Sequence, residues 1–331
     1  MTLPLPVLVA DIGGTHARFA LVTEERTTAL APVRTRDHAS VADAIASMLA
    51  GRTPPRSAML ALAGPVKDET VRLTNAEWTI DPRSLLERFD LAEVLLINDF
   101  EALAMALPEL QGGDLMAIGG RLPGGPGVKV VVGPGTGLGA AALIPAGDFL
   151  VPVAGEGGHM DLGPRDDRDR ALWRVLAPKN ERISAEMLIS GPGLVRLYRA
   201  VCQAMGAAVA FDTPEAIVAA GLAGKDAAAR EAVDVFATYL GRFAGNLAVL
   251  FMAKGGVYLA GGVTEALAPF LGSSRFREAF ADKAPHNALL AGMATAVITH
   301  KAPALAGLAA YVRHPLRFRL NLEGRRWTRG R

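Results

Sequence analysis

Cysteine is almost absent from this 331-residue chain, which contains only Cys202. A single thiol excludes an internal disulfide and a zinc cluster built from cysteines, and it suits a reducing compartment. Long apolar runs are also missing, because stretches such as 289–299 fall well short of the roughly 18–20 residues that a membrane-spanning helix needs. The N-terminus lacks a basic leader and is interrupted by Pro4, Pro6 and Asp11, so no signal peptide is expected. These absences predict a soluble, cytoplasmic protein.

Apolar residues and glycine, by contrast, are abundant. Half of the chain is hydrophobic, 21% is charged, and its 36 glycines are not concentrated in one block, which excludes a disordered or collagen-like protein. This length predicts two domains or one large one. Residues 313–331 hold seven arginines and one acidic residue, a net charge of +6, whereas the rest of the chain holds 28 basic and 32 acidic residues. Such a tail can bind nucleic acid, but a solvated extension is the favoured interpretation.

Strand-like and helix-like segments alternate along the chain, which predicts an α/β architecture. The predicted strands are 5–10, 18–22, 57–63, 71–75, 94–98, 128–132, 140–144 and 257–260. The predicted helices are 41–49, 82–89, 101–106, 227–252 and 304–313. A Gly/Pro-rich stretch, 119–127, marks a candidate domain boundary nearby. Residues 7–22 also match 128–143 without a gap at five of sixteen positions, the pattern that two related halves would produce.

The first glycine turn, Gly13-Gly14-Thr15, follows a buried-looking strand that brings Asp11 to its end. Glycines let successive backbone N–H groups turn outward and form a nest for an anion. Thr15 adds a hydroxyl, and Asp11 is suitably located to hold Mg²⁺ through water. A plain hairpin turn is the alternative. Phosphate binding is favoured, because an acid at the strand end is unusual for a mere turn.

A second turn, 133–139, follows another apolar strand, and a third, Gly261-Gly262, follows the strand at 257–260. Gly135–Ala140 satisfies the dinucleotide fingerprint G-x-G-x-x-A, but that fingerprint requires a helix to begin at the loop. Here a short strand meets Pro145 and Gly147, so a Rossmann fold is rejected. No P-loop motif occurs either. Three glycine turns after strands together favour a nucleotide site.

These motifs have a familiar order. The sequence resembles the bacterial glucokinase family over roughly residues 7–312, on six motifs that match in order and spacing: Asp11–Thr15, Leu96–Phe100, Gly135–Gly139, Gly155–His159, Ser184–Glu186 with Ser190–Leu194, and Ala260–Gly262. The resemblance implies the actin–hexokinase–chaperone ATPase fold, in which two related α/β domains of a duplicated ribonuclease H-like fold flank an ATP and sugar cleft. It implies a small domain of 1–109 plus about 300–331, a large domain of 110–299, and a cytoplasmic homodimer.

The resemblance also implies where ATP binds, with Mg²⁺ accompanying the nucleotide. Its first phosphate loop would be Ala10, Asp11, Ile12, Gly13, Gly14 and Thr15. Its second would include Gly135, Thr136 and Gly137, and Gly261 and Gly262 would lie against the adenosine. The sequence departs from the family at His16, where asparagine is commoner, at Ala10, where glycine is frequent, and at Pro134, which replaces a small residue.

Asp99 is the candidate general base, because it follows an apolar strand and a kinase needs a carboxylate to accept the proton of the attacking hydroxyl. The adjacent Asn98 would bind a sugar hydroxyl, since an amide both donates and accepts. Taken without the resemblance, the better interpretation is that Asn98 and Asp99 cap the helix predicted from Glu101. With the resemblance, catalysis is favoured, and Asp99 could do both.

The remaining substrate ligands implied are Glu156 and His159, in a glycine-rich loop, and Glu186, at a predicted helix start. Carboxylates accept hydrogen bonds from vicinal hydroxyls, and imidazole donates or accepts. The alternatives are a metal site at Glu156 and His159, and a charge favourable to a helix N-terminus at Glu186. No metal is expected, because the cysteine cluster that accompanies such a histidine in related kinases is absent. Asn75 and Trp78 are candidates for the border of the sugar pocket.

The function expected is therefore an ATP-dependent glucokinase that makes glucose 6-phosphate and ADP, with no membrane or nucleic-acid partner. The alternatives are a kinase for another hexose and a non-catalytic sugar-binding regulator on the same fold. Regulators of that kind usually carry an N-terminal DNA-binding domain, whereas the nucleotide strand here begins by residue 5. The retained Asp99 also argues against a sensor without activity.

Overall fold

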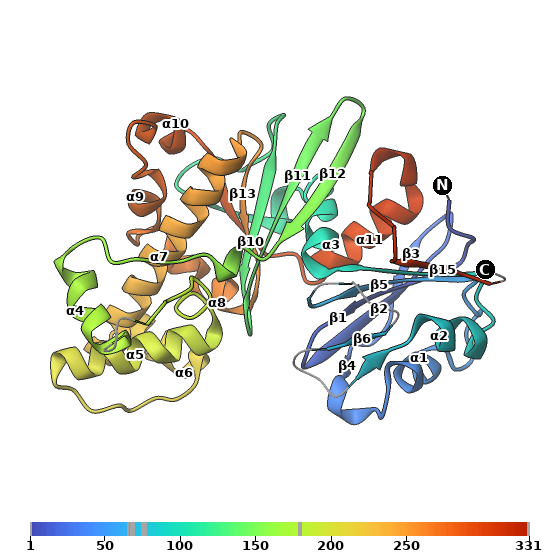
Figure 1. The fold of residues 1–331 in the computed structure, drawn as a ribbon, viewed down its shortest axis with the longest axis horizontal. Helices are drawn as coiled ribbons and strands as arrows, with labels where there is room; N and C mark the ends of the chain where they lie inside the picture. Colours follow the sequence, from blue (N-terminus) through green and yellow to red (C-terminus); the bar gives the residue numbers. More distant parts are fainter. Residues whose placement is uncertain (1, 65, 67–69, 74–77, 178–180, 330–331) are drawn as a thin grey trace. The chain divides into compact units, whose positions relative to one another are not determined.

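The computed structural model describes residues 2–64, 66, 70–73, 78–177 and 181–329 (Figure 1). They form two compact units. The first consists of Met1–Leu110, Leu143–Ala154 and His300–Arg331, and the second of Gln111–Ala142 and Gly155–Thr299. The division predicted from the sequence, 1–109 with about 300–331 against 110–299, stays a prediction. The first unit is thus assembled from three separate stretches of chain.

A seven-stranded sheet forms the centre of the first unit, in the order β15-β8-β5-β1-β2-β3 with β4 also on β2. Its strands are β1 (Val7–Ile12), β2 (His16–Val22), β3 (Thr27–Ala29), β4 (Val33–Arg34), β5 (Ser57–Leu62), β8 (Glu93–Asn98) and β15 (Arg326–Thr328). The separate pair β6 (Val71–Arg72) and β7 (Thr79–Ile80) also belongs to this unit. Strands β1, β5 and β8 are parallel, and Ile12, Leu62 and Asn98 are in register at their carboxyl ends. Residues after β1 and after β8 therefore lie on one edge of the sheet.

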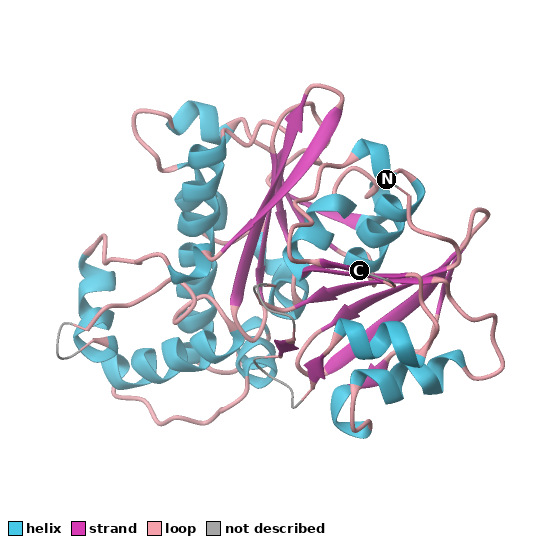
Figure 2. Cartoon of the chain, turned by 45° about the vertical axis from the view of Figure 1, so that its right-hand side comes forward, coloured by secondary structure: helices cyan, strands magenta, loops and turns pink. Residues whose placement is uncertain are grey.

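Helices cover both faces of this sheet (Figure 2). They are α1 (Val41–Leu49), α2 (Pro82–Arg88), α3 (Asp99–Ala106) and α11 (Pro303–Arg313). Ile45 of α1 and Leu85 of α2 pack with Leu8, Leu60 and Leu96 in one buried cluster, while α3 and α11 pack against each other and the opposite face. Because both faces are covered, the central strands are continuous apolar runs rather than alternating ones.

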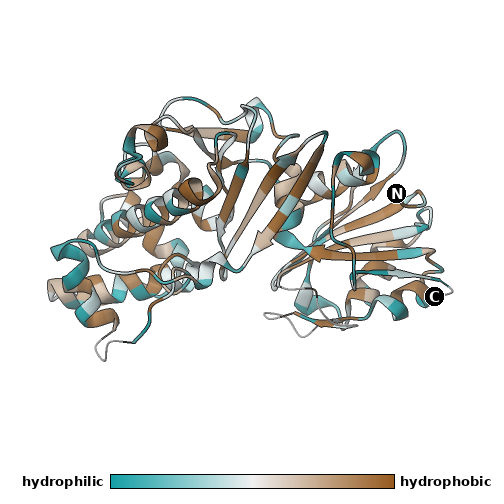
Figure 3. Cartoon of the chain, turned by 45° about the horizontal axis from the view of Figure 1, so that its top comes forward, coloured by the Kyte–Doolittle hydropathy of each residue, from teal (hydrophilic) through white to brown (hydrophobic). Residues whose placement is uncertain are grey.

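The second sheet has the order β12-β11-β10-β13-β14-β9, and its strands are among the most hydrophobic segments in Figure 3. They are β9 (Leu115–Ile118), β10 (Lys129–Pro134), β11 (Leu138–Ala146), β12 (Phe149–Gly155), β13 (Gly256–Leu259) and β14 (Thr295–Ile298). The helices of the second unit are α4 (Asp167–Leu176), α5 (Gly191–Met205), α6 (Pro214–Leu222), α7 (Ala227–Phe251), α8 (Gly262–Leu271), α9 (Phe276–Ala281) and α10 (Asn287–Ala291). Strands β9, β10, β13 and β14, the start of β11 and the long α7 belong to the second unit.

The predicted helices and all but one of the predicted strands are confirmed with small shifts of their ends, whereas the strand predicted at 71–75 is strand only at Val71–Arg72, and its residues 74 and 75 lie outside the described residues. The strand predicted at 5–10 is Val7–Ile12, and the helix predicted at 227–252 is Ala227–Phe251. After the second glycine turn the chain continues as strand β11 and not as a helix, which confirms the rejection of the dinucleotide fold. No helix within the described ranges has both the length and the apolar character needed to cross a membrane.

The arginine-rich tail is not the solvated extension that its composition favours, and that interpretation is wrong. Its strand β15 pairs antiparallel with β8, and Trp327 is only 8% exposed. Arg325 forms an ion pair with Glu101, and Arg326 forms one with Glu93. Without β15, strand β8 would be an edge strand with unpaired backbone groups and buried acids nearby. The tail completes the sheet and supplies the counter-charges.

Candidate functional site

The first glycine turn joins β1 to β2 and is tied down through its carbonyl groups. The Gly13 N–H donates to the carbonyl of His16 at 3.0 Å. Thr35 donates from its hydroxyl to the carbonyl of Gly14 at 2.7 Å and from its N–H to the carbonyl of Thr15 at 3.0 Å. Within the described part of the chain, the N–H groups of Gly14 and Thr15 have no acceptor. Two adjacent free donors beside a strand end can bind an anionic oxygen.

Asp11 is the carboxylate of this turn, one residue before the end of β1. Burial raises the pKa of its carboxyl group, and the nearby charge of Arg18 partly offsets that rise. The closest approach between the two side chains joins Arg18 Nη1 to Asp11 Oδ2 at 3.7 Å, so the pair is loose. A partly desolvated acid with a weakly held partner is typical of a functional site.

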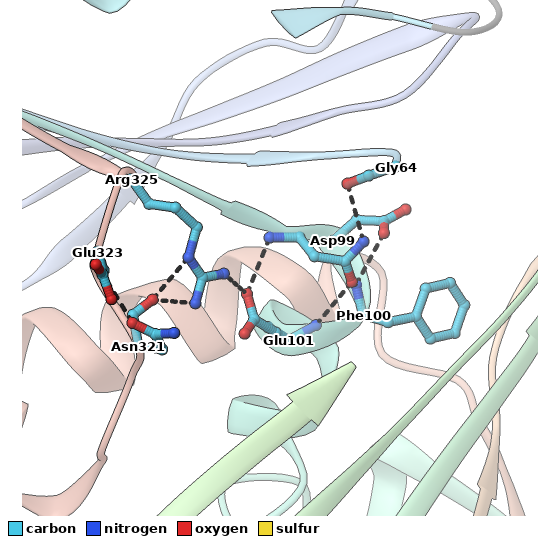
Figure 4. Close-up of polar contacts among 8 residues, drawn as sticks. Gly64, Asp99, Phe100, Glu101, Asn321, Glu323 and Arg325 are labelled. Atoms are coloured by element: carbon cyan, nitrogen blue, oxygen red, sulfur yellow. Dashed lines mark hydrogen bonds and ion pairs between the residues drawn. The ribbon is translucent and has the colours of Figure 1, made fainter. Parts of the chain in front are cut away.

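Asn98 is the last residue of β8, and Asp99 (Figure 4) follows it at the same sheet edge. Asn98 is the N-cap of α3, and its Oδ1 accepts the N–H groups of Phe100 at 2.9 Å and Glu101 at 3.3 Å. Its Nδ2 donates to the carbonyl of Gly64 at 3.2 Å. The capping interpretation is therefore confirmed for Asn98, whose amide keeps one N–H beyond these bonds.

Asp99 is the first residue of α3, so the helix begins two residues before the predicted Glu101. Its Oδ1 accepts the N–H of Phe100 at 2.9 Å. The side chain is partly buried, and the strand that precedes it and the helix that it opens both fix its main chain. Asp99 is thus a carboxylate held in one orientation at the edge that also carries the first glycine turn.

In the second unit, the turn between β10 and β11 carries Gly135, Thr136 and Gly137. Gly135 donates its N–H to the carbonyl of Gly137 and accepts the N–H of Gly191, both at 2.8 Å. Gly135 and Thr136 are exposed. A Cβ added at Gly137 would lie 2.6 Å from Glu186 Oε2. A side chain at position 137 would therefore displace the Glu186 carboxylate, which lies directly against the loop.

Glu186 holds that loop through a hydrogen bond, accepting the N–H of Leu138 on Oε2 at 2.9 Å. Its own N–H donates to the carbonyl of Gly158 at 2.8 Å, which lies in the short 3₁₀ helix Gly157–His159. The prediction that Glu186 begins a helix is wrong. It lies in a turn, and α5 begins at Gly191 because Ser190 supplies the N-cap.

Glu156 immediately precedes the same 3₁₀ helix, and His159 is its last residue. Both side chains are open to solvent, with 67% and 58% exposed, and His159 Nε2 lies 3.7 Å from Glu156 Oε2. Because the Glu186 N–H donates to Gly158 of this helix, the structure brings the three predicted sugar ligands together within one unit. Among the described residues, no group of three or more His, Cys, Asp or Glu side chains could hold a metal ion.

Gly261 and Gly262 join β13 to α8. Gly261 has a φ of +95°, and a Cβ there would collide with the carbonyl of Pro134, so the second glycine turn and this one are in contact. The sequence predicts only a turn at this point, whereas Gly262 begins a ten-residue helix. The N–H groups at a helix N-terminus can bind an anion or a polar ligand group.

Comparison with known proteins decides the family. The family model described as Glucokinase matches residues 8–315. A glucokinase of Sinorhizobium medicae is 47% identical over 330 residues, which cover 98% of this chain and 97% of that protein. The chain belongs to the glucokinase family. A crystal structure of a glucokinase from an Antarctic psychrotroph has a TM-score of 0.81 and 30% identity, covering 93% of this chain and 98% of the other.

A ROK family glucokinase from Streptomyces griseus, solved in complex with glucose and AMPPNP, is a more distant relative in fold. Its TM-score is 0.62 at 23% identity, over 92% of this chain and 97% of that one. The fold of the glucokinase-family chain is accordingly the actin-like ATPase fold with mixed α/β units, as the resemblance implies. Membership of this kinase family makes the chain an ATP-dependent phosphotransferase.

Two residues important to this glucokinase-family site have no signal in the motifs. Thr35 holds Gly14 of the first glycine turn from 21 residues further along the chain, and Arg325 is paired with the capping residue Glu101. Of the two candidates for the pocket border, Asn75 lies outside the described residues. Trp78 is 2% exposed, and its indole donates to the carbonyl of His38 at 3.0 Å, which makes it a core residue.

Proposed function

We propose that the chain transfers the γ-phosphate of ATP to the 6-hydroxyl of D-glucose, giving glucose 6-phosphate and ADP. The observation that carries this proposal is the carboxylate of Asp99, fixed at the start of α3 on the sheet edge that also presents the first glycine turn. Family membership supports a hexose as the acceptor. Phosphoryl transfer needs mainly orientation and charge stabilisation, and this edge offers both.

In this proposal Asp99 is the general base. One of its oxygens is committed to the N–H of Phe100, and this bond fixes the direction of the carboxylate. The carboxylate orients the 6-hydroxyl and accepts its proton as the hydroxyl oxygen attacks the γ-phosphorus. Asn98, whose amide retains one N–H, donates it to a neighbouring sugar hydroxyl.

We infer that Glu156, His159 and Glu186 bind further hydroxyl groups of glucose. The two exposed side chains, Glu156 and His159, are open to an incoming ligand, and the bond from Leu138 orients Glu186. Carboxylate pairs accept from vicinal hydroxyls, so a sugar that lacks one of them would leave a site acceptor unpaired. This set supports selectivity for a hexose over shorter polyols.

ATP is proposed to bind through the three glycine turns. The first phosphate loop consists of Ala10, Asp11, Ile12, Gly13, Gly14 and Thr15. The second consists of Gly135, Thr136 and Gly137. The adenosine lies against Gly261 and Gly262. The N–H groups of Gly14 and Thr15, which have no acceptor among the described residues, support the first assignment, and the N-terminus of α8 supports the last. Mg²⁺ accompanies the nucleotide and neutralises phosphate charge, and the carboxylate oxygens of Asp11 are ligands of the kind that this ion prefers.

We also propose the assembly and location expected from the resemblance, a homodimer in the cytoplasm. The single cysteine, Cys202, is buried and unpaired, which supports a reducing compartment. Size-exclusion chromatography with light scattering would measure the assembly, with a mass of twice 34.6 kDa expected.

The decisive experiment is ADP release from Mg-ATP across a panel of hexoses, with Asp99→Asn as the test variant. Asp148→Asn, on the exposed turn between β11 and β12, is the matched control. We expect turnover concentrated on glucose, unchanged in the control and reduced by roughly 10³-fold or more in Asp99→Asn. Turnover on another hexose would overturn the substrate but keep the mechanism. Glucose binding by calorimetry without turnover on any sugar would indicate a sensor.

A further inference from the structure

Glu101 is a carboxylate that the fold buries, with a side chain 9% exposed. It lies in the first turn of α3, where its Oε2 accepts the N–H of Asn98 at 3.1 Å and closes a capping box around Asp99. When a capping box lies at the protein surface, water solvates the charge of its acidic residue. A buried acid requires a cation, because an isolated charge away from water is strongly disfavoured.

Arg325 supplies that cation from 224 residues away in the sequence. Its Nη1 lies 2.6 Å from Glu101 Oε2, and its side chain is 12% exposed. The same carboxylate oxygen therefore accepts both the guanidinium and the Asn98 N–H. The position of the guanidinium consequently determines where that oxygen lies, and through it the main chain at Asn98.

Arg325 is itself held at both ends (Figure 4). Its Nε donates to the carbonyl of Asn321 at 2.7 Å, which fixes the plane of the guanidinium. Its own carbonyl accepts the N–H of Leu96 at 3.0 Å, two residues before Asn98 on β8. One residue of the tail thus binds the main chain just before Asn98 and the side chain just after Asp99.

We propose that Arg325 is a positioning residue that sets the orientation of Asp99 and Asn98 in the phosphoryl-transfer site. This inference rests on the proposed role of Asp99 as the base. Arg325 touches no reacting atom; it acts through Glu101 and β8. Arginine is required because its planar, forked guanidinium donates to Glu101 and Asn321 at once, whereas a lysine ammonium offers no such fixed pair of directions.

The test compares kcat and KM for Arg325→Met, Arg325→Lys and Arg329→Met in the full chain. Arg329 is the matched control, because it is an arginine of the same tail whose ion pair with Asp90 is exposed. We expect Arg325→Met to lower kcat roughly 10- to 100-fold, since a misplacement of about 1 Å costs that much, with the KM for ATP within about twofold. Arg325→Lys should restore part of the loss, and Arg329→Met should match the wild type within about twofold.

A folded Arg325→Met variant with kcat within about twofold of the wild type would overturn the inference. If Arg325→Met does not fold, the double variant Glu101→Gln/Arg325→Gln is assayed in its place, because it leaves neither member of the buried ion pair charged. A kcat loss of fivefold or more supports the inference there, and a smaller loss overturns it. Asp99→Asn, assayed in parallel, separates the two proposals. If it is inactive while Arg325→Met is normal, only the positioning role fails; if Asp99→Asn is fully active, the base assignment itself fails.

Discussion

Replacing Gly307 with alanine would test whether helix packing behind Asp99 sets its position. Gly307 lies within α11 where it crosses α3. An added Cβ would collide with the carbonyl of Ala102 and lie 2.8 Å from the Ala106 nitrogen, whereas ordinary contact begins at 3.4 Å. The obstacle is the backbone of α3 and not a flexible side chain, so the two helices must separate by on the order of 1 Å.

Two effects of this substitution oppose each other. Alanine is favoured over glycine inside a helix by about 0.5–1 kcal/mol, whereas overpacking a tight contact costs about 1–3 kcal/mol. Because the collision is with backbone, we expect overpacking to dominate and Gly307→Ala to lower the free energy of unfolding by about 1–2 kcal/mol. Because α3 carries Asp99 in its first turn, kcat should also fall by roughly tenfold or more.

Urea unfolding and ADP-release kinetics would measure both effects. Gly272→Ala is the matched control, because Gly272 has right-handed backbone geometry and no atom within 4 Å of its added Cβ. The control should be neutral or slightly stabilising. A Gly307→Ala variant as stable as the wild type, with unchanged kcat, would refute the reasoning, since it would mean that α3 moves freely against α11 without disturbing Asp99.

Three further predictions concern charge and contact in the two units. Asp11→Asn removes an acid whose pKa burial raises, so at pH 7 the variant should have a higher free energy of unfolding in urea than the wild type. This difference should vanish below about pH 3.8, where Asp11 is protonated in both the folded and the unfolded wild type. The activity of the variant should fall roughly 10²-fold. Burial lowers the pKa of Lys283 to about 8, so Lys283→Met should gain about 1 kcal/mol at pH 7, after allowance for solvent screening. That gain should shrink toward pH 10, because the folded wild type loses its unfavourable charge while the unfolded chain keeps its proton; equal gains at both pH values would contradict it. Gly137→Ala should push Glu186 from the Leu138 N–H and raise the KM for glucose roughly fivefold with little change in melting temperature; an unchanged KM would count against the sugar-ligand assignment.

Features with a local cause were predictable from the sequence. The parallel strands read as apolar runs because helices cover both of their faces, and glycine at positions 13–14 and 261–262 marks the ends of such runs. A local feature also excludes the dinucleotide fold, since Pro145 and Gly147 leave too few residues for a helix after the second turn. Two helices start at other residues than the sequence predicts: Asn98 caps a helix that begins at Asp99 and not at Glu101, and Ser190 caps α5, which begins at Gly191.

Features that depend on distant partners were not predictable. The arginines of the tail look like a solvated run because nothing near them in sequence neutralises them. Their partners, Glu93 and Glu101, lie more than 200 residues away and become visible only once β15 pairs with β8. The contact between Glu186 and Gly137 was likewise not predictable, because the turn between β10 and β11, and not their spacing in the sequence, brings the two residues together.

The three-part composition of the first unit has a consequence for synthesis on the ribosome. Residues 1–110 emerge first, but their sheet lacks β15 and one face lacks α11 until the last stretch, 300–331, has been made. During that interval β8, with the sequence EVLLIN, presents an apolar edge that can pair with other chains. The chain is therefore most vulnerable to aggregation while its second unit is being translated, and a stop codon before residue 325 should yield an insoluble product rather than a slow enzyme.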